Sequence, residues 1–173
     1  MKQKIDRKRA WRYLLPWALT LLWMGLIFAF SAQDAESSSQ FSGQTAFGAA
    51  FWFWPGFSSL SAEEQAIWVE NAQFLVRKTA HFLVYAGLGV LLCWDFSRLN
   101  QPCSRKIGLA WAIGTAYAAS DEIHQLFVPG RSGQLRDVLL DSTGVLIGLL
   151  SALALSFLYK KAAAKAAAKR IQK

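Results

Sequence analysis

The residues of this chain that could do chemistry gather in three short segments. The first contains Arg77, Lys78, His81 and Tyr85. Residues four apart share one face of an α-helix, so the spacing places Arg77, His81 and Tyr85 on a common face. Arginine binds phosphate through a bidentate fork and lysine as a point charge, whereas imidazole titrates near neutral pH. This segment predicts phosphate binding by Arg77 and Lys78 beside a general acid or base, His81.

The second and third segments add carboxylates, a second histidine and another cation. They contain Asp121, His124, Gln125, Arg131, Asp137 and Asp141. On a helix, Asp121 shares a face with either His124 or Gln125. His124 is a second candidate general acid or base, and Arg131 is a third candidate ligand for phosphate. Mg²⁺ prefers carboxylate ligands, so the three aspartates are candidate catalytic residues that could hold this metal: Asp121, Asp137 and Asp141.

Some polar residues near these segments are weaker candidates. Those expected to bind substrate or to orient the catalytic groups are Ser31, Gln33, Tyr85 and Gln125. We expect Glu122 and Arg136 to be surface groups, because Glu122 adjoins Asp121 and therefore points to a different helix face. The two histidines have no cysteine nearby, so the spacing gives no strong zinc pattern.

The composition indicates what kind of element must hold these residues. Of 173 residues, 54% are hydrophobic and 17% are charged, and the mean hydropathy is +0.23. A typical soluble domain has roughly 25% charged residues. A disordered chain needs low hydrophobicity, and a disulfide scaffold needs more than two cysteines. We therefore expect a small membrane protein with several spans.

Four segments are candidate spans: 13–30, about 79–94, one that starts near Ile107, and about 138–159. A signal peptide is the alternative for the first segment, but its apolar part is longer than usual and no convincing cleavage site follows. The third segment is apolar only over 107–120, which reaches about 21 Å of a hydrocarbon core of roughly 30 Å. The polar residues from Asp121 onward must therefore complete that crossing or lie at its outer edge.

Basic residues cluster at both termini and between the second and third candidate spans. The clusters lie in 1–12, 95–106 and 160–173. Cytoplasmic segments of membrane proteins carry an excess of lysine and arginine, so this pattern predicts that both termini are cytoplasmic. The net charge of +8 does not indicate nucleic-acid binding, because the basic residues flank apolar spans. In this orientation all four spans bring their polar residues to the outer face of the membrane.

The predicted fold is an all-α bundle of four transmembrane helices, with residues 13–159 as the membrane domain. An outer loop over about 31–76 contains an aromatic stretch, 47–57, which could lie at the headgroup interface or pack on the bundle. Ser61 and Glu64 form a capping-box pattern that predicts a helix running toward the second span. Gly144 and Gly148 form a GxxxG pattern that permits close helix approach beside Asp141.

At these residues the sequence resembles the VanZ-like family of bacterial membrane proteins. The matching segments are 30–33, 77–82 with Tyr85, 121–125, 127–131, and Asp137, Asp141 and Gly144. One departure is Val84, where many family members have glutamate. The resemblance implies a multi-pass protein of the bacterial cytoplasmic membrane. The founding member is associated with low-level resistance to teicoplanin-type glycopeptides, which supplies a phenotype but no reaction.

Two functions fit the residues. One is a membrane enzyme acting on a phosphate-bearing lipid or lipid-linked cell-wall precursor at the outer leaflet. The other is a non-enzymatic protein that binds the same lipid or precursor. Purely structural use of the polar residues is disfavoured, because each polar contact in a membrane contributes only about 0.6 kcal/mol. Ionisable residues within spans usually face a cavity, so we expect these residues to converge in one outward-facing pocket.

Overall fold

The computed structural model describes the backbone of residues 7–171 and the side chains of residues 14–169. Within that range the chain is helical and has no strand, which confirms the all-α class. Its elements are α1 (Arg7–Ser31), α2 (Ala35–Phe53), the 3₁₀ turn η1 (Phe57–Ser59), α3 (Ala62–Ser97), α4 (Cys103–Gln125) and α5 (Leu135–Ile171). The basic side chains of 1–12, predicted to be cytoplasmic, lie outside the described side chains.

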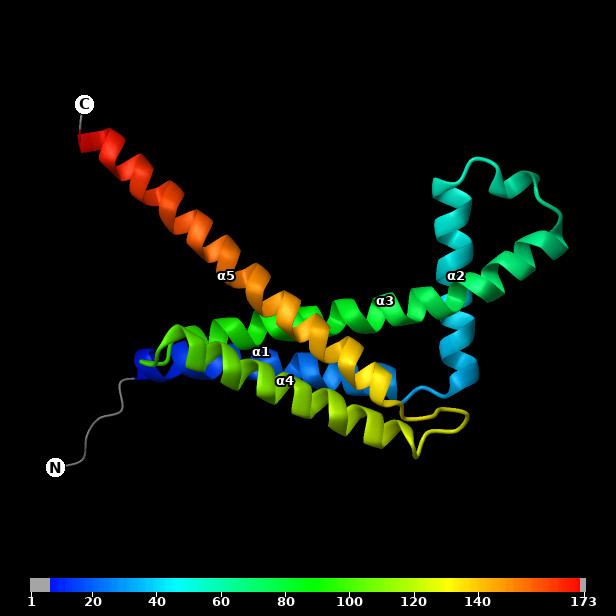
Figure 1. Cartoon of the computed structure of the whole chain (residues 1–173), viewed down its shortest axis with the longest axis horizontal. Coiled ribbons are helices and arrows are strands. Elements are labelled where there is room, and N and C mark those ends of the chain that lie inside the picture. The colour runs from blue at the N-terminus through cyan, green and yellow to red at the C-terminus, as the bar shows by residue number, and fades with distance from the viewer. Residues whose placement is uncertain (1–6, 172–173) are drawn as a thin grey trace.

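The helices form a bundle from which two parts project (Figure 1). α1 and α4 lie along α3, and α5 crosses α3 obliquely, making the most extensive contact in the bundle. α2 stands steeply across the N-terminal half of α3, and the C-terminal end of α5 extends away from the other helices. The N-terminal part of α5, the C-terminal end of α4 and the middle of α3 therefore meet at one end of the bundle.

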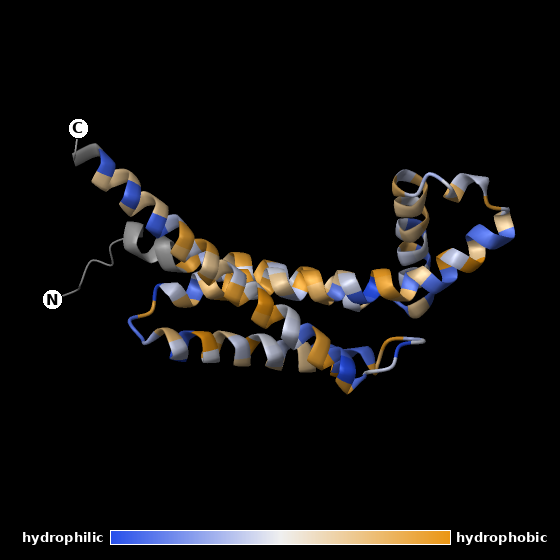
Figure 2. Cartoon of the chain, turned by 45° about the horizontal axis from the view of Figure 1, so that its top comes forward, coloured by the Kyte–Doolittle hydropathy of each residue, from blue (hydrophilic) through white to orange (hydrophobic). Residues whose placement is uncertain are grey.

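Three helices are long and apolar enough to cross a membrane: α1 over Leu14–Ser31, α3, and α5 over Leu135–Lys169. The predicted third span, α4, is not among them in the described part of the chain. Its last two turns carry Asp121, Glu122, His124 and Gln125, which lower its hydropathy. Large apolar side chains such as Leu22 (69% exposed) and Leu83 (60% exposed) lie on the outside of the bundle, as lipid contact requires. Hydrophobic residues recur along the helices of the bundle, whereas the projecting C-terminal end of α5 carries hydrophilic residues (Figure 2).

Glycines allow α3 and α5 to approach each other closely. A Cβ atom added to Gly148 would collide with the carbonyl oxygen of Ala86, and one added to Gly144 would lie 2.6 Å from the carbonyl oxygen of Phe82. The same holds in the other direction, because a Cβ atom on Gly89 would strike the backbone of Val145. The GxxxG pattern therefore lies at the helix contact that it predicts.

The core lies along this contact and is closed by α1 and α4. Its fully buried side chains include Tyr85, Leu88, Leu92, Val145 and Leu149. The Trp23 indole Nε1 donates to the carbonyl oxygen of Val84 at 2.8 Å, which ties α1 to α3. The Trp111 indole donates to the carbonyl oxygen of Ser142 at 3.1 Å, which ties α4 to α5.

The helix α3 begins where the capping-box pattern predicts. The Ser61 side chain accepts a hydrogen bond from the backbone amide of Glu64, and the Glu64 carboxylate accepts one from the amide of Ser61. These reciprocal bonds satisfy amides that the first helical turn leaves without partners. From there α3 continues without a break over 36 residues, so the outer segment and the predicted second span form one helix.

The helix α2 was not predicted, because residues 31–60 were expected to form a loop. Its first turn is capped by Asp34, whose carboxylate accepts from the backbone amide of Ser37 at 2.7 Å. Its small residues Ser38, Ser42, Gly43, Ala46 and Ala50 are buried, and Gly43 packs against Val69 of α3. The aromatic stretch 47–57 spans the end of α2 and the turn η1, and it is divided, since Phe57 is fully buried whereas Trp52 and Phe53 are 80% and 87% exposed.

Candidate functional site

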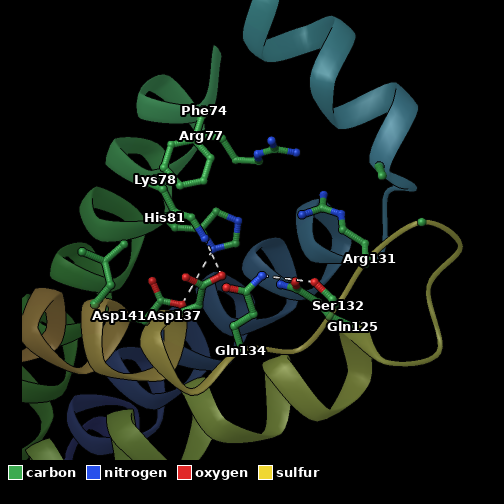
Figure 3. Close-up of a pocket in the computed structure, with 13 residues that line it drawn as sticks. Phe74, Arg77, Lys78, His81, Gln125, Arg131, Ser132, Gln134, Asp137 and Asp141 are labelled. Carbon is green, nitrogen blue, oxygen red and sulfur yellow. Dashed lines mark hydrogen bonds and ion pairs between the residues drawn. The ribbon is translucent and has the colours of Figure 1, made fainter. Parts of the chain in front are cut away.

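Seven of the predicted polar residues line a pocket of about 200 Å³ at the end of the bundle where α3, α4 and α5 meet (Figure 3). The loop between α4 and α5 closes one side. The residues that line the pocket are Ala35, Phe74, Arg77, Lys78, His81, Gln125, Gly130, Arg131, Ser132, Gln134, Asp137, Leu140 and Asp141. Three cationic side chains thus face two carboxylates and a histidine within one cavity.

Lys78 and Asp137 form the ion pair that joins α3 to α5 at the edge of the pocket. The Lys78 ammonium donates to the Asp137 carboxylate, and their side chains are 25% and 18% exposed. Lys78 also lies 5.4 Å from the centre of the Phe74 ring, a cation–π distance. The pair leaves Lys78 with a carboxylate partner, so this lysine is less available for a phosphate than the sequence suggests.

His81 lies one turn further along α3, beside a deeply buried carboxylate. The His81 Nδ1 atom is 3.7 Å from the Asp141 Oδ2 atom, within ion-pair range but longer than a hydrogen bond. The Asp141 side chain is 1% exposed, and neither of its oxygens has a hydrogen-bond partner in the described part of the chain. Because a buried carboxylate without partners is costly, Asp141 is poised to accept a proton or hydrogen bond from His81 or from a ligand.

A second layer of polar groups lies beneath the pocket. Tyr85 is fully buried, and its hydroxyl donates to the Oδ2 atom of Asp121 at 3.2 Å. The Oδ1 atom of Asp121 is buried and has no partner in the described part of the chain. The i, i+4, i+8 spacing of Arg77, His81 and Tyr85 thus leads from the pocket into the core, where Tyr85 contacts α4.

Arg77 and Arg131 reach the pocket on the side that faces α2 (Figure 3). Among the described side chains, the ion pairs are Lys78–Asp137 and His81–Asp141, so neither arginine is paired. Burial lowers the pKa of Arg131, and the positive charge of Arg77 lowers it further. A guanidinium in a protein nevertheless stays charged. Two half-buried, mutually repelling cations therefore face a cavity that an anion would stabilise.

The loop after α4 holds Arg131 in place. The Arg131 Nε atom donates to the carbonyl oxygen of Gln33 at 3.2 Å, and the amide of Ala35 donates to the carbonyl oxygen of Pro129 at 3.2 Å. Gly130 has a φ of 71°, a conformation that glycine adopts freely, and a Cβ atom there would lie 2.9 Å from the Cβ of Ala35. The start of α2 and this loop therefore position the arginine together.

The polar residues at the ends of α1 and α4 mostly orient their neighbours. The Gln125 side chain lines the pocket and donates to the hydroxyl of Ser31, which is buried, at 2.9 Å. Gln33 contributes its backbone carbonyl to Arg131. Glu122, expected at the surface, is only 5% exposed and accepts from the amide of Gln134 at 2.8 Å. Glu122 is buried because the loop between α4 and α5 folds back over α4 and covers that helix face.

His124 lies apart from the other candidate residues. Its ring stacks on Phe28 of α1 with centroids 4.4 Å apart, and it is not among the residues that line the pocket. Of the two residues that could share a helix face with Asp121, Gln125 lines the pocket and His124 does not. The sequence left that choice open, because residues three and four positions apart both fall on one side of a helix.

The three aspartates predicted as magnesium ligands do not form a ligand cluster. Among the described residues, no group of three histidine, cysteine, aspartate or glutamate side chains is arranged to hold a metal ion. Asp137 is engaged by Lys78, Asp141 faces His81, and Asp121 accepts from Tyr85. Each carboxylate thus has a different neighbour, although the three segments do approach one another.

Two polar lining residues were not predicted from the sequence. Gln134 and Ser132 lie in the loop between α4 and α5, where the side-chain amide of Gln134 donates to the Ser132 hydroxyl at 3.2 Å. No helical spacing marks loop residues, so only their position next to Arg131 could have indicated them. They add neutral hydrogen-bonding groups to the lining of the pocket.

The site combines anion-binding guanidinium groups with a histidine beside a buried carboxylate. No curated protein and no solved structure matches the chain. The family model described as VanZ/LLP1 matches residues 16–158, which include every residue that lines the pocket. The three membrane-compatible helices and this match over most of its length agree with the resemblance found at the site residues. The chain is a membrane protein that belongs to the VanZ/LLP1 family.

Proposed function

We propose that this protein acts on a phosphate-bearing lipid or a lipid-linked cell-wall precursor at the outer leaflet of the bacterial cytoplasmic membrane. The observation that carries the proposal is the position of Arg77 and Arg131, which line the pocket without carboxylate partners beside His81 and Asp141. Arginine forks match the geometry of phosphate oxygens, and each charge-assisted bond is stronger than a neutral one.

The orientation follows from the distribution of charge. With both termini and the 95–106 segment in the cytoplasm, α4 crosses as a fourth span and the pocket opens outward. The polar last turns of α4 can lie in a membrane because Tyr85, Ser31 and the amide of Gln134 contact them. The GxxxG contact holds α3 and α5 together directly beneath the pocket.

In the enzymatic form of the proposal, each pocket residue has a distinct role. Arg77 and Arg131 hold the phosphate, and His81 takes a proton from an attacking hydroxyl or gives one to a departing oxygen. Asp141 positions the imidazole and stabilises its charged form. Lys78 and Asp137 close the edge of the pocket, and a carboxylate there could also engage Mg²⁺ brought by the substrate.

A non-enzymatic binder is the second candidate, and one observation favours it. Ser132 carries the one side-chain hydroxyl among the lining residues, and it accepts from Gln134 rather than contacting His81. The pocket itself therefore offers no activated nucleophile of the serine–histidine kind. In this form the protein retains the precursor, and glycopeptide resistance in the family follows from altered access to it.

Product release from bacterial lipid extract tests the proposal and separates its two forms. The purified protein is incubated with extract, with and without Mg²⁺, and lipids are followed by mass spectrometry. The two histidines of the chain provide a matched pair of variants. His81→Ala should abolish a headgroup change, whereas His124→Ala should retain most of it because His124 does not line the pocket.

Three results are distinguishable. A headgroup change lost in folded His81→Ala supports the enzyme. One lipid class that co-purifies with wild type, is lost in Arg131→Ala and is not altered supports the binder. If no headgroup changes and no lipid co-purifies in an Arg131-dependent way, the proposal is overturned in both forms.

A further inference from the structure

We propose that a groove beside the polar pocket holds one hydrocarbon chain of the lipid, so that the phosphate sits where groove and pocket join. This inference rests on the proposed function and names the substrate class more closely. The groove has a volume of about 200 Å³ and lies between α1, α2 and α3. Its lining is largely apolar and includes Ile27, Phe30, Phe41, Ala80 and Val84.

The groove and the pocket share three residues. Arg77, His81 and Arg131 line both cavities, whereas the apolar side chains line the groove alone. The two guanidinium groups therefore stand at a boundary between polar and apolar surroundings. A ligand with a negative charge next to a hydrocarbon chain would satisfy both sides of this boundary at once. A free anion would leave the groove empty, and a neutral apolar molecule would leave the arginines unpaired.

The position of the groove favours a lipid chain over other occupants. Two of its three helices, α1 and α3, are long and apolar enough to cross the membrane, so lipid chains surround them. Phe30 and Phe41 line the groove and are 51% and 64% exposed, which puts aromatic side chains at its mouth. A chain can therefore enter sideways from the leaflet without leaving an apolar environment.

The shared boundary also limits what the lipid can be. Because the same arginines border both cavities, the phosphate must lie directly beside the hydrocarbon portion. Any group on the far side of the phosphate must fit the pocket of about 200 Å³, next to Lys78, Asp137 and Gln134. The inferred substrate class is a lipid phosphate whose chain adjoins the phosphate and whose polar substituent is small.

Photocrosslinking with a chain-labelled probe tests where the chain lies. The probe is a long-chain alkyl phosphate with a diazirine in the middle of its chain, and the matching alkyl alcohol is the phosphate-free control. After irradiation with the full-length protein in nanodiscs, labelled peptides are identified by mass spectrometry. We expect the phosphate probe to label groove residues in α1, α2 and α3, and the alcohol to label them at least roughly tenfold less, as loss of one charge-assisted contact implies.

Two neighbouring positions on α3 provide matched variants. Ala80 is exposed and lines the groove but not the pocket, whereas Thr79 is exposed and lines neither cavity. Ala80→Phe should fill the groove and remove the labelling there, and Thr79→Phe should leave it unchanged. Because both changes add a phenyl ring to an exposed helix position, a general effect on folding would appear in both.

The outcomes separate this inference from the proposed function. Groove labelling that needs the phosphate, disappears in Ala80→Phe and falls in Arg131→Gln supports the inference. Labelling that depends on Arg131 but spreads over lipid-facing residues such as Leu83, or persists in Ala80→Phe, overturns the groove and leaves the proposed function intact. Labelling that is equal for phosphate and alcohol and insensitive to Arg131→Gln overturns both.

Discussion

The contact between α3 and α5 has two halves with opposite character. Toward the core, Gly89 of α3 packs so tightly on Val145 and Leu149 of α5 that a Cβ atom added to Gly89 would strike their backbone. Toward the loop, the same two helices diverge around a cavity and present Lys78 to Asp137 and His81 to Asp141. The first half leaves no space, and the second leaves buried oxygens without partners.

This difference separates the residues that stabilise the bundle from those available for binding. Close glycine packing gains dispersion contacts along the whole tight half, which lipid contact alone cannot provide. In the loose half, the partly exposed ion pair of Lys78 and Asp137 is of a kind that adds at most about 1 kcal/mol. Substitutions in the tight half should therefore change stability, and substitutions in the loose half should change function.

The largest expected effect is that of a side chain placed in the tight half. Gly148→Leu drives a side chain into the carbonyl oxygen of Ala86, so we expect a loss of about 3 kcal/mol of stability, the upper range for overpacking. Thermal unfolding of the purified protein measures it. Gly108→Ala is the control, because a Cβ atom at Gly108 meets nothing within 4 Å and alanine favours the helix. Equal melting temperatures for the two variants would contradict the comparison.

Helical spacing predicted much of both halves. The Arg77, His81 and Tyr85 face, the Asp137 and Asp141 face and the GxxxG contact each depend on one helix being regular, which local sequence controls. The capping box at Ser61 likewise depends on residues three apart. Features of this kind can be predicted from sequence because the residues involved lie within a few turns of one helix, whose geometry is regular.

Features that depend on packing between distant segments were not predictable. The helix α2 is rich in serine and glycine, which favour helices weakly, and it forms against α3 through its small buried residues. His124 stacks on Phe28, and Glu122 is covered by the loop at Gln134. In each of these the deciding partner lies on another element, so no spacing within one segment could identify it.

The second prediction separates function from stability at the most buried carboxylate. Asp141→Asn removes a buried charge whose oxygens lack partners, so stability should stay equal or rise, by up to about 1–3 kcal/mol. If His81 is the general acid or base, headgroup turnover should fall roughly a hundredfold, the lower range for such catalysis. The pair of measurements is thermal unfolding and product release across pH. A large loss of stability would instead make Asp141 a structural residue.

The third prediction concerns the unpaired guanidinium groups. Arg131→Gln should weaken binding of a phosphate-bearing lipid by roughly ten- to a hundredfold, because a hydrogen bond to a charged group contributes about 1.5–3 kcal/mol. Arg136→Gln is the matched control, since Arg136 is exposed and does not line the pocket. Equilibrium binding to nanodiscs containing the lipid measures both. Equal weakening in the two variants would indicate general attraction to an anionic surface instead of a site.

The smallest expected effect lies at the N-terminal cap of α2. The cap contacts neither half of the interface between α3 and α5, but the adjoining segment 33–35 holds Arg131 and the loop before it by hydrogen bonds. Hydrogen bonds from Ser37 lower the pKa of Asp34 below its usual 3.8. A group with a lowered folded-state pKa stabilises above its unfolded pKa, and that stabilisation is lost as the pH falls through the lowered value. Asp34→Ala should therefore raise hydrogen exchange in the first turn of α2 at neutral pH, and the difference from wild type should begin to shrink below pH 3.8 and disappear as the pH falls through the lowered pKa.

Asp34→Asn sharpens this test, because asparagine also caps helices but does not titrate in this range. Protection of the first turn of α2 against exchange, corrected for the intrinsic pH dependence of the exchange rate, should stay close to that of wild type at neutral pH and should not change as the pH falls. If the Asp34→Ala difference persisted at low pH, Asp34 would act through packing at the start of α2 instead of through its charge. The position of Arg131 would then depend on the contact between Gly130 and Ala35 more than on the cap, and phosphate binding in Asp34→Ala would match that of wild type at every pH.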